Sequence, residues 1–291
     1  ERWRQVVDPY GAVLIGESNP RTLDRLERYV HGNGLHTIFY LALVWAEWKP
    51  EEILTNLEIV HATSDVGISW VLDNHDASRS ATRFGGGDLG RRRSLALMTF
   101  LSGLGGFPFL WEGQELGLVN ARLKAKDLED PISTRNVPHN DDEDSYFLRG
   151  RDVTRTVMPW DSTHANGFAA TAEPWLHAPL RPEDETVAGQ QQDAASWLHR
   201  HRELLEVRRT LPDLWQAAPR WESATNPTVR SVKRGSVVVV TNLGEAGAEY
   251  EPPAGEWEMR YDSSWARLPG EVYTGSIELP AETSYILERI G

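Results

Sequence analysis

Short apolar runs recur along the first 111 residues of the chain, and polar, amphipathic stretches separate them. The runs cover residues 11–16 (GAVLIG), 35–43, 68–72 and 107–111. Each is continuous in apolar residues rather than alternating, which predicts four strands buried on both faces. The run at 11–16 is bounded by glycines and is expected to be fully buried.

The stretches between the runs predict helices. Pro50 opens a segment in which Ile53, Leu54, Leu57 and Val60 fall on one helical face. Asp88 is placed as the N-cap of a largely buried helix that ends in the glycine-rich segment 103–106. Strands that alternate with helices indicate parallel βαβ units, whose functional residues lie at the carboxyl ends of the strands.

The remaining chain changes character twice. Periodicity disappears over residues 120–192, where Pro, Asn, Asp and His accumulate, and this predicts a long irregular excursion. Helical spacing returns at 193–215. Beyond residue 227 the apolar segments are short, rich in Val, Tyr and Trp, and separated by turn residues. They predict a small antiparallel β domain over 220–291.

Composition excludes several classes of function. The 43 acidic and 30 basic side chains give a net charge of −13, so the field of the protein repels nucleic acid and anionic membrane surfaces. No apolar stretch has the roughly 18 to 20 residues that a membrane-spanning helix needs, and no signal peptide is visible, which predicts a soluble, cytoplasmic protein. The chain has no cysteine, and its histidines show no metal-ligand spacing, so neither a metal nor a cofactor is expected.

Two carboxyl groups follow predicted strands. Glu17 comes directly after the run at 11–16, and Asp76 follows the run at 68–72. Carboxyls from two strands of one sheet can converge on a single bond, one acting as general acid and the other staying ionised, as glycoside hydrolysis requires. From spacing alone, an N-cap or a loop ion pair is the favoured explanation of each residue.

Several motifs add a family resemblance. Asn74-His75-Asp76, with Arg79 three positions later, resembles the strand-seven motif of glycoside hydrolase family 13, the α-amylase family. Residues 13–17 (VLIGE) resemble its strand-five motif, and residues 106–117 resemble its strand-eight segment. Residues 150–160 (GRDVTRTVMPW) are similar to a segment of bacterial α-glucosidases and oligo-1,6-glucosidases.

The resemblance implies an α/β fold. Residues 1–219 would form strands five to eight of a partial (β/α)8 TIM barrel, with the loop excursion at 120–192, and residues 220–291 would form a small antiparallel β-sandwich. It also implies that Glu17 is the general acid/base, that Asp76 stabilises the transition state and that His75 hydrogen-bonds the sugar. Asn74 and Arg79 would orient these groups.

Retention of configuration also needs a carboxylate nucleophile, which in this family ends a strand-four motif G-x-R-x-D. The chain has no such motif. We therefore expect the C-terminal half of an enzyme, inactive alone and dependent on an N-terminal half-barrel. The intact parent would hydrolyse terminal α-glucosidic bonds of oligosaccharides or disaccharides.

Two alternatives stay open. The first is a transglycosylating member of the family, of the trehalose synthase or sucrose-active type, in which an acceptor other than water takes the glycosyl group. The second is a non-catalytic carbohydrate-binding protein, which the absent nucleophile and the 27 aromatic residues allow.

Overall fold

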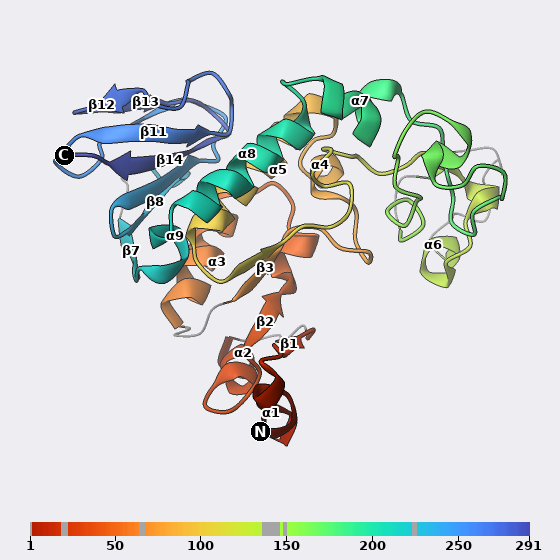
Figure 1. The fold of residues 1–291 in the computed structure, drawn as a ribbon, viewed down its shortest axis with the longest axis horizontal. Coiled ribbons are helices and arrows are strands. Elements are labelled where there is room, and N and C mark those ends of the chain that lie inside the picture. Colours follow the sequence, from red (N-terminus) through yellow and green to blue (C-terminus); the bar gives the residue numbers. More distant parts are fainter. Residues whose placement is uncertain (1, 19–22, 64–67, 136–145, 148–149, 223–225) are drawn as a thin grey trace. The chain divides into compact units, whose positions relative to one another are not determined.

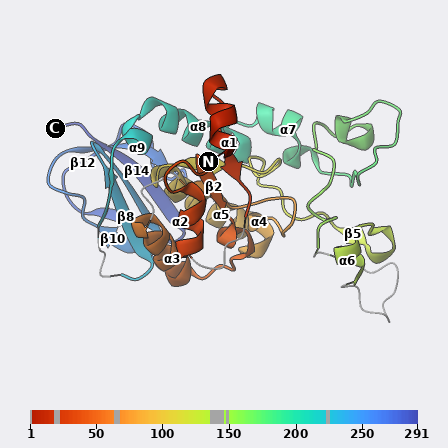
Figure 2. The ribbon, with the colours of Figure 1, turned by 90° about the horizontal axis from the view of Figure 1, so that it is seen from below.

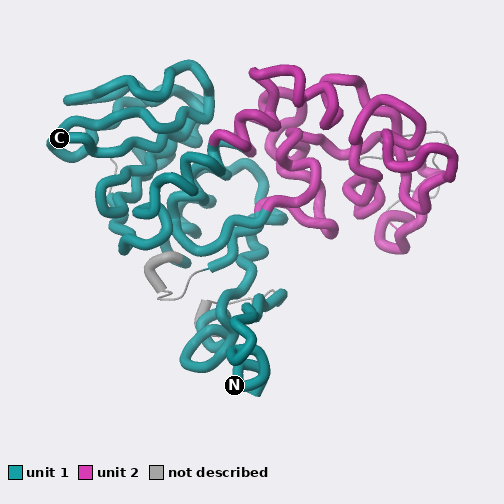
Figure 3. The backbone as a smooth tube through the Cα atoms, in the orientation of Figure 1, with its two compact units in different colours: residues 1–71, 95–109, 204–291 teal, residues 72–94, 110–203 magenta. Residues whose placement is uncertain are grey.

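The computed structural model describes residues 2–18, 23–63, 68–135, 146–147, 150–222 and 226–291. The chain divides into two compact units, coloured separately in Figure 3. Unit 1 comprises residues 1–71, 95–109 and 204–291, and unit 2 comprises residues 72–94 and 110–203. Among the described residues, no helix has both the length and the apolar character needed to cross a membrane.

Unit 1 contains a parallel sheet whose strands follow the chain order (Figure 1). Its members are β1 (Ile15–Gly16), β2 (Thr37–Tyr40), β3 (Ser69–Val71) and β4 (Phe107–Phe109). All three neighbouring pairs are parallel, with Gly16 opposite Ile38 and Val71 opposite Phe109. The predicted parallel arrangement is confirmed.

Helices connect these strands. The face of α3 (Pro50–Thr63) that was predicted from sequence is buried, since Ile53, Leu54, Leu57 and Val60 are at most 3% exposed. Apolar burial on this scale stabilises a helix that its own backbone hydrogen bonds would hold only marginally. The other N-terminal helical segments are α1 (Arg2–Val7), η1 (Asp8–Tyr10), α2 (Leu23–Val30) and η2 (Leu41–Trp45).

Three predictions about these elements are wrong in detail. The run at 11–16 forms only the two-residue strand β1, and Val13 and Ile15 are 57% and 41% exposed, because β1 is an edge strand paired with β2 alone among the described residues. The run at 35–43 turns into η2 after Tyr40. Asp88 lies in the first turn of α5 (Gly87–Gly103) and is not its N-cap.

Unit 2 is mostly loop, as predicted for residues 120–192 (Figures 1 and 2). A small apolar cluster of Ala121, Leu123, Leu128 and Val153 anchors part of it. The short elements within unit 2 are α4 (Ser80–Arg83), β5 (Leu123–Lys124), η3 (Ala125–Asp127), α6 (Pro131–Arg135), β6 (Tyr146–Phe147), η4 (His164–Gly167), η5 (Glu183–Glu185) and α7 (Val187–Gln192). The helices predicted for 193–215 are α8 (Trp197–Thr210) and α9 (Asp213–Gln216).

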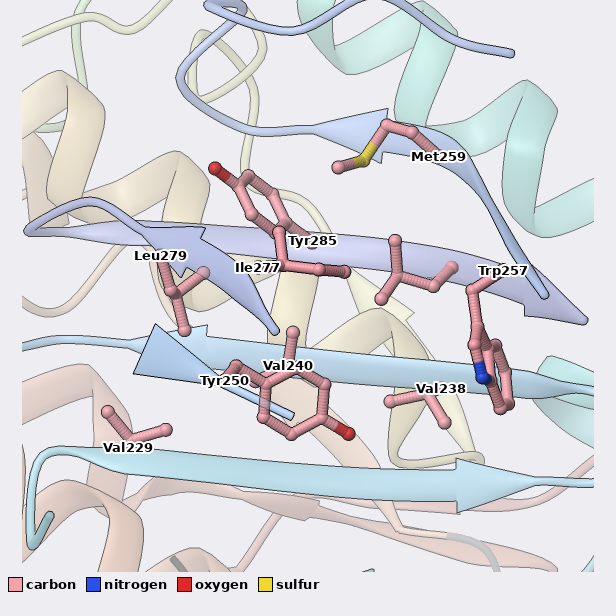
Figure 4. Close-up of a cluster of buried hydrophobic side chains, with 10 residues drawn as sticks. Val229, Val238, Val240, Tyr250, Trp257, Met259, Ile277, Leu279 and Tyr285 are labelled. Atoms are coloured by element: carbon pink, nitrogen blue, oxygen red, sulfur yellow. The ribbon is translucent and has the colours of Figure 1, made fainter. Parts of the chain in front are cut away.

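The C-terminal part of unit 1 is an antiparallel, two-layered β structure, as predicted. Six strands pair in the order β12-β11-β14-β9-β8-β7, and β10 pairs with β13 separately. Figure 4 shows the core between these layers, where Trp257, Tyr285 and Val240 are fully buried beside Ile277. The strands are β7 (Pro219–Glu222), β8 (Val229–Arg234), β9 (Val237–Asn242), β10 (Ala248–Tyr250), β11 (Trp257–Asp262), β12 (Val272–Tyr273), β13 (Ile277–Leu279) and β14 (Thr283–Arg289).

The predicted division into residues 1–219 and 220–291 differs from the compact units. Residues 219 and 220 both belong to β7 and to unit 1. The division into a half-barrel over 1–219 and a C-terminal β domain over 220–291 stays a prediction.

Candidate functional site

The loop that follows β3 is fixed at both ends by one buried carboxylate. Asp73 is 3% exposed, and its two oxygens accept hydrogen bonds from the backbone N–H of Ser80 at 2.5 Å and from the Ser80 hydroxyl at 2.9 Å. Arg83 lies 3.5 Å away. Burial raises the pKa of Asp73, while Arg83, Arg79 and the Ser80 donors oppose that rise. The intervening residues 74–79 carry the predicted site.

Arg79 ties this loop to two other segments of unit 2. Its side chain is 1% exposed, and its guanidinium donates to the carbonyl of Glu112 at 2.6 Å and to the carbonyl of Thr154 at 3.2 Å. Its backbone N–H donates to Asn120 Oδ1 at 2.8 Å. Arg79 thus holds the loop in place and is not exposed to a ligand.

Asn74 shapes the turn that presents its neighbours. Its Oδ1 accepts a hydrogen bond from the backbone N–H of Asp76 at 2.9 Å, which forms an Asx turn. This bond replaces a backbone hydrogen bond of regular secondary structure and so favours a turn at this point of the loop. His75 lies against Trp111, with ring centroids 5.9 Å apart and a tilt of 49°. His75 Nε2 is 3.4 Å from Asp76 Oδ1. The imidazole and the carboxylate therefore form one polar surface.

Two arginines bracket Asp76. Arg155 Nη2 donates to Asp76 Oδ1 at 2.9 Å, and Arg151 Nε lies 3.0 Å from the same oxygen. Both arginines also contact Asp130 Oδ2, Arg155 through Nη1 at 3.3 Å and Arg151 through Nη1 at 3.9 Å. The side chain of Asp76 is 25% exposed, so the pairs fix its orientation while leaving the group accessible.

Glu17 is exposed and directly follows β1 in unit 1. The other four predicted site residues, Asn74, His75, Asp76 and Arg79, belong to unit 2. The structure brings these four together in one loop. That Glu17 acts with them stays a prediction.

Asp152, whose setting in a Gly-Arg-Asp sequence resembles the missing nucleophile motif only superficially, has structural partners. It is 7% exposed and accepts the backbone N–H groups of Glu129 and Asp130 at 3.1–3.2 Å. Burial works against its ionisation, but the hydrogen bonds from Ser133, Glu129 and Asp130 outweigh that effect and lower the pKa of Asp152. It anchors the loop before α6.

Sequence reasoning did not select Arg151, Arg155, Asp130 or Asp73 as part of the site. A signal was present for the first two, because both belong to the segment 150–160 that carries the α-glucosidase resemblance. No signal in the sequence pointed to Asp130, which lies 54 positions from Asp76. Among the described residues, no group of three or more histidine or acidic side chains could hold a metal ion.

Comparisons with known proteins agree with these motifs. The family model described as the alpha amylase catalytic domain matches residues 3–217. A probable alpha-glucosidase of Rhizobium meliloti is 26% identical over 97% of this chain and 51% of its own length. An oligo-1,6-glucosidase of Heyndrickxia coagulans is 25% identical over 88% of this chain and 52% of its own length.

Among solved structures, the alpha-glucosyl transfer enzyme XgtA superposes with a TM-score of 0.79 at 27% identity. The match covers 99% of this chain and 53% of that one. The chain therefore spans about half the length of the relatives that it matches.

Proposed function

The chain belongs to the alpha-amylase catalytic-domain family, and we propose that it supplies part of the active site of an α-glucosidase. The matched region is 53% of the solved relative, which fits a partial (β/α)8 barrel. In this assignment β1 to β4 are strands five to eight of that barrel. The β structure at 220–291 is a separate C-terminal domain that packs on it.

The observation that carries the proposal is the loop 73–80, in which Asp76 is held in one orientation by Arg151 and Arg155. An oxocarbenium-like centre develops positive charge, and a carboxylate fixed in advance beside it lowers the barrier without reorganisation. Asp76 takes this role. His75 hydrogen-bonds a hydroxyl of the reacting sugar, while Asn74 and Arg79 hold the loop.

Glu17 is the general acid that protonates the leaving-group oxygen, and afterwards the base that activates the incoming water or alcohol. The covalent intermediate needs a further carboxylate, on the opposite face of the sugar and about 5 to 5.5 Å from the acid. No G-x-R-x-D motif occurs in these 291 residues. The nucleophile has to come from a segment outside them, in an N-terminal half-barrel.

The test begins with the coding DNA upstream of Glu1, in which an in-frame segment ending in G-x-R-x-D is expected. The longer protein should release p-nitrophenol from p-nitrophenyl α-glucoside. Glu17→Gln and Asp76→Asn should each lower kcat by at least about 100-fold, while Glu47→Gln, an exposed carboxylate in unit 1, should not change it. Turnover by residues 1–291 alone would refute the assignment of a missing nucleophile.

A transfer reaction is the second candidate, supported by the similarity to an alpha-glucosyl transfer enzyme. The same residues would catalyse transfer, because an alcohol that takes the place of water at the covalent intermediate accepts the glucosyl group instead. Product analysis with sucrose separates the two reactions: hydrolysis releases glucose and fructose in equal amounts, whereas transfer releases fructose and gives a new glucoside. Sugar binding without either product would instead favour a binding protein.

A further inference from the structure

The chain just before β1 is bonded to a histidine side chain. The backbone N–H of Leu14, three positions before Glu17, donates to His36 Nδ1 at 3.0 Å. The carbonyl of Leu14 accepts the backbone N–H groups of His36 and Thr37 at 3.1 Å and 3.3 Å. These three hydrogen bonds hold Leu14 to the start of β2. Of the three, the bond to the imidazole is the one that depends on the protonation of a side chain.

That bond determines the charge and the tautomer of the imidazole. A backbone N–H is always a donor, so His36 Nδ1 has to present a lone pair, and the proton of the neutral ring is then on Nε2. Protonation of the ring would place an N–H of His36 against the N–H of Leu14. The hydrogen bond between the two residues therefore exists only while the imidazole is neutral.

The charged groups that face the ring, among the described residues, come from the segment before β1. His36 Nε2 lies 3.4 Å from Asp8 Oδ1 in η1. Arg4 in α1 donates to the same oxygen at 2.7 Å, and this bond holds the pKa of Asp8 below its usual range. Nε2 carries a proton in both forms of the ring, so the contact with Asp8 survives protonation. Protonation thus leaves the imidazole beside Asp8 and frees the N–H of Leu14.

The bonds at Leu14 are a large part of what places β1 against β2. The two strands pair over only two residues of β1. β2 is anchored on its other side, because Thr37 is fully buried and its hydroxyl lies 2.9 Å from the hydroxyl of Ser69 in β3. A change at Leu14 therefore moves β1 rather than β2. Glu17 directly follows β1, so its carboxyl group moves with that strand.

We propose that His36 is a positioning residue for Glu17: the neutral imidazole holds β1 against β2, and protonation releases Leu14 and displaces the Glu17 carboxyl group. A small misplacement of a catalytic group is costly, so activity falls on the acid side for a reason separate from the titration of the catalytic carboxyls. The role of Glu17 in this statement rests on the proposed function, and the bond between His36 and Leu14 does not.

The first test measures amide hydrogen exchange at Leu14 in residues 1–291, which needs no catalytic activity. Histidine side chains change charge within the range of about pH 5 to 8. Protection of the Leu14 amide, corrected for the intrinsic effect of pH on exchange, should fall by about fivefold from pH 8 to pH 5, the factor expected for one hydrogen bond.

Variants assign that change to His36. His36→Asn keeps an acceptor oxygen at the position of Nδ1 but cannot be protonated, so the Leu14 amide should be equally protected at both pH values. His36→Leu has no acceptor and should leave the amide unprotected at both. His31→Gln is the matched control at an exposed histidine of the same unit, and it should behave as the wild type does.

The second test uses the longer protein and the ratio of kcat in His36→Asn to kcat in the wild type. The ratio should be close to one at pH 8 and should rise at least about twofold by pH 5, because the variant alone keeps Leu14 bonded. Titration of the catalytic carboxyls affects both proteins alike and cancels in the ratio. A histidine that only maintains the fold would give a constant ratio, as His31→Gln should.

The outcomes separate the two proposals. Protection that is lost at pH 5 in the wild type and kept in His36→Asn, together with the rising ratio of kcat, supports the positioning role. Equal protection of the wild type at both pH values, or an equal loss in His36→Asn, overturns it, and so does a constant ratio in a protein that Glu17→Gln inactivates. If Glu17→Gln leaves kcat unchanged, the failure belongs to the proposed function, and the exchange data still decide whether His36 releases Leu14.

Discussion

The substitution Asp73→Asn tests whether the loop 73–80 is held by a buried charge. The change keeps the size of the side chain but removes its negative charge. Arg83, whose side chain is 11% exposed, then loses its carboxylate partner and keeps its bonds to the carbonyls of Leu72 and Ser78 at 2.8 Å. One of the two donors from Ser80 also loses its acceptor on residue 73, because an amide NH2 replaces one carboxylate oxygen.

The expected loss of unfolding free energy is about 3 kcal/mol. Breaking a buried ion pair by removing one partner costs about 3 to 5 kcal/mol, and the carbonyl bonds that Arg83 retains place this case at the lower end. Urea unfolding followed by circular dichroism measures the change from the shift in midpoint at constant slope.

Asp88→Asn is the matched control, because Asp88 is 76% exposed and its 3.3 Å contact with Arg91 is a surface pair. Exposed pairs contribute about 0 to 1 kcal/mol. A loss at Asp73 no larger than that at Asp88 would mean that Asp73 carries no charge in the folded protein. The loop 73–80 would then not be held by a buried charge.

Two further predictions concern single positions elsewhere. Burial lowers the pKa of His201 from 6.5 to about 4, so between these pH values the unfolded state binds more protons than the folded state. The free energy of unfolding should therefore fall by about 3 kcal/mol as the pH drops from 6.5 to 4. Calorimetry should show no such loss in His201→Gln, whereas the variant His164→Gln, at an exposed histidine, should retain it. Gly106→Ala should lower the free energy of unfolding by more than about 2 kcal/mol, because φ is +67° and a Cβ would lie 1.9 Å from the carbonyl oxygen of Ile68. Gly86→Ala is the control: φ is +70° but a Cβ would meet no atom within 4 Å, so the loss in the same urea assay should be about 1 kcal/mol.

The sequence predicted those features that depend on local pattern. The buried face of α3 follows from the spacing of Ile53, Leu54, Leu57 and Val60, because helical geometry alone brings them together. The turn at Asn74 to Asp76 is likewise local. The exposure of Val13 and Ile15 could not be predicted in this way, since an apolar strand is buried only where other elements cover it, and β1 has one neighbour among the described residues.

The candidate site shows the same limit at the level of chemistry. The motif identified Asp76, but the groups that orient it, Arg151 and Arg155, lie 75 and 79 positions further along the chain, and no periodicity connects them. Their presence changes what Asp76 can do. A free carboxylate in water reorients when charge develops beside it, whereas one held by two arginines is already placed.

That placement has an energetic consequence for the proposed reaction. The positive charges of Arg151 and Arg155 offset part of the negative potential of Asp76. Each arginine also pairs with Asp130, so the net charge of the two arginines and two aspartates is zero. The bracket therefore orients Asp76 without adding a net positive charge that would repel an oxocarbenium-like centre. Removing Asp130 would leave an excess of one positive charge beside Asp76. In the longer protein, Asp130→Asn should therefore lower kcat more than it raises KM, and equal effects on both would argue that Asp130 only maintains the fold.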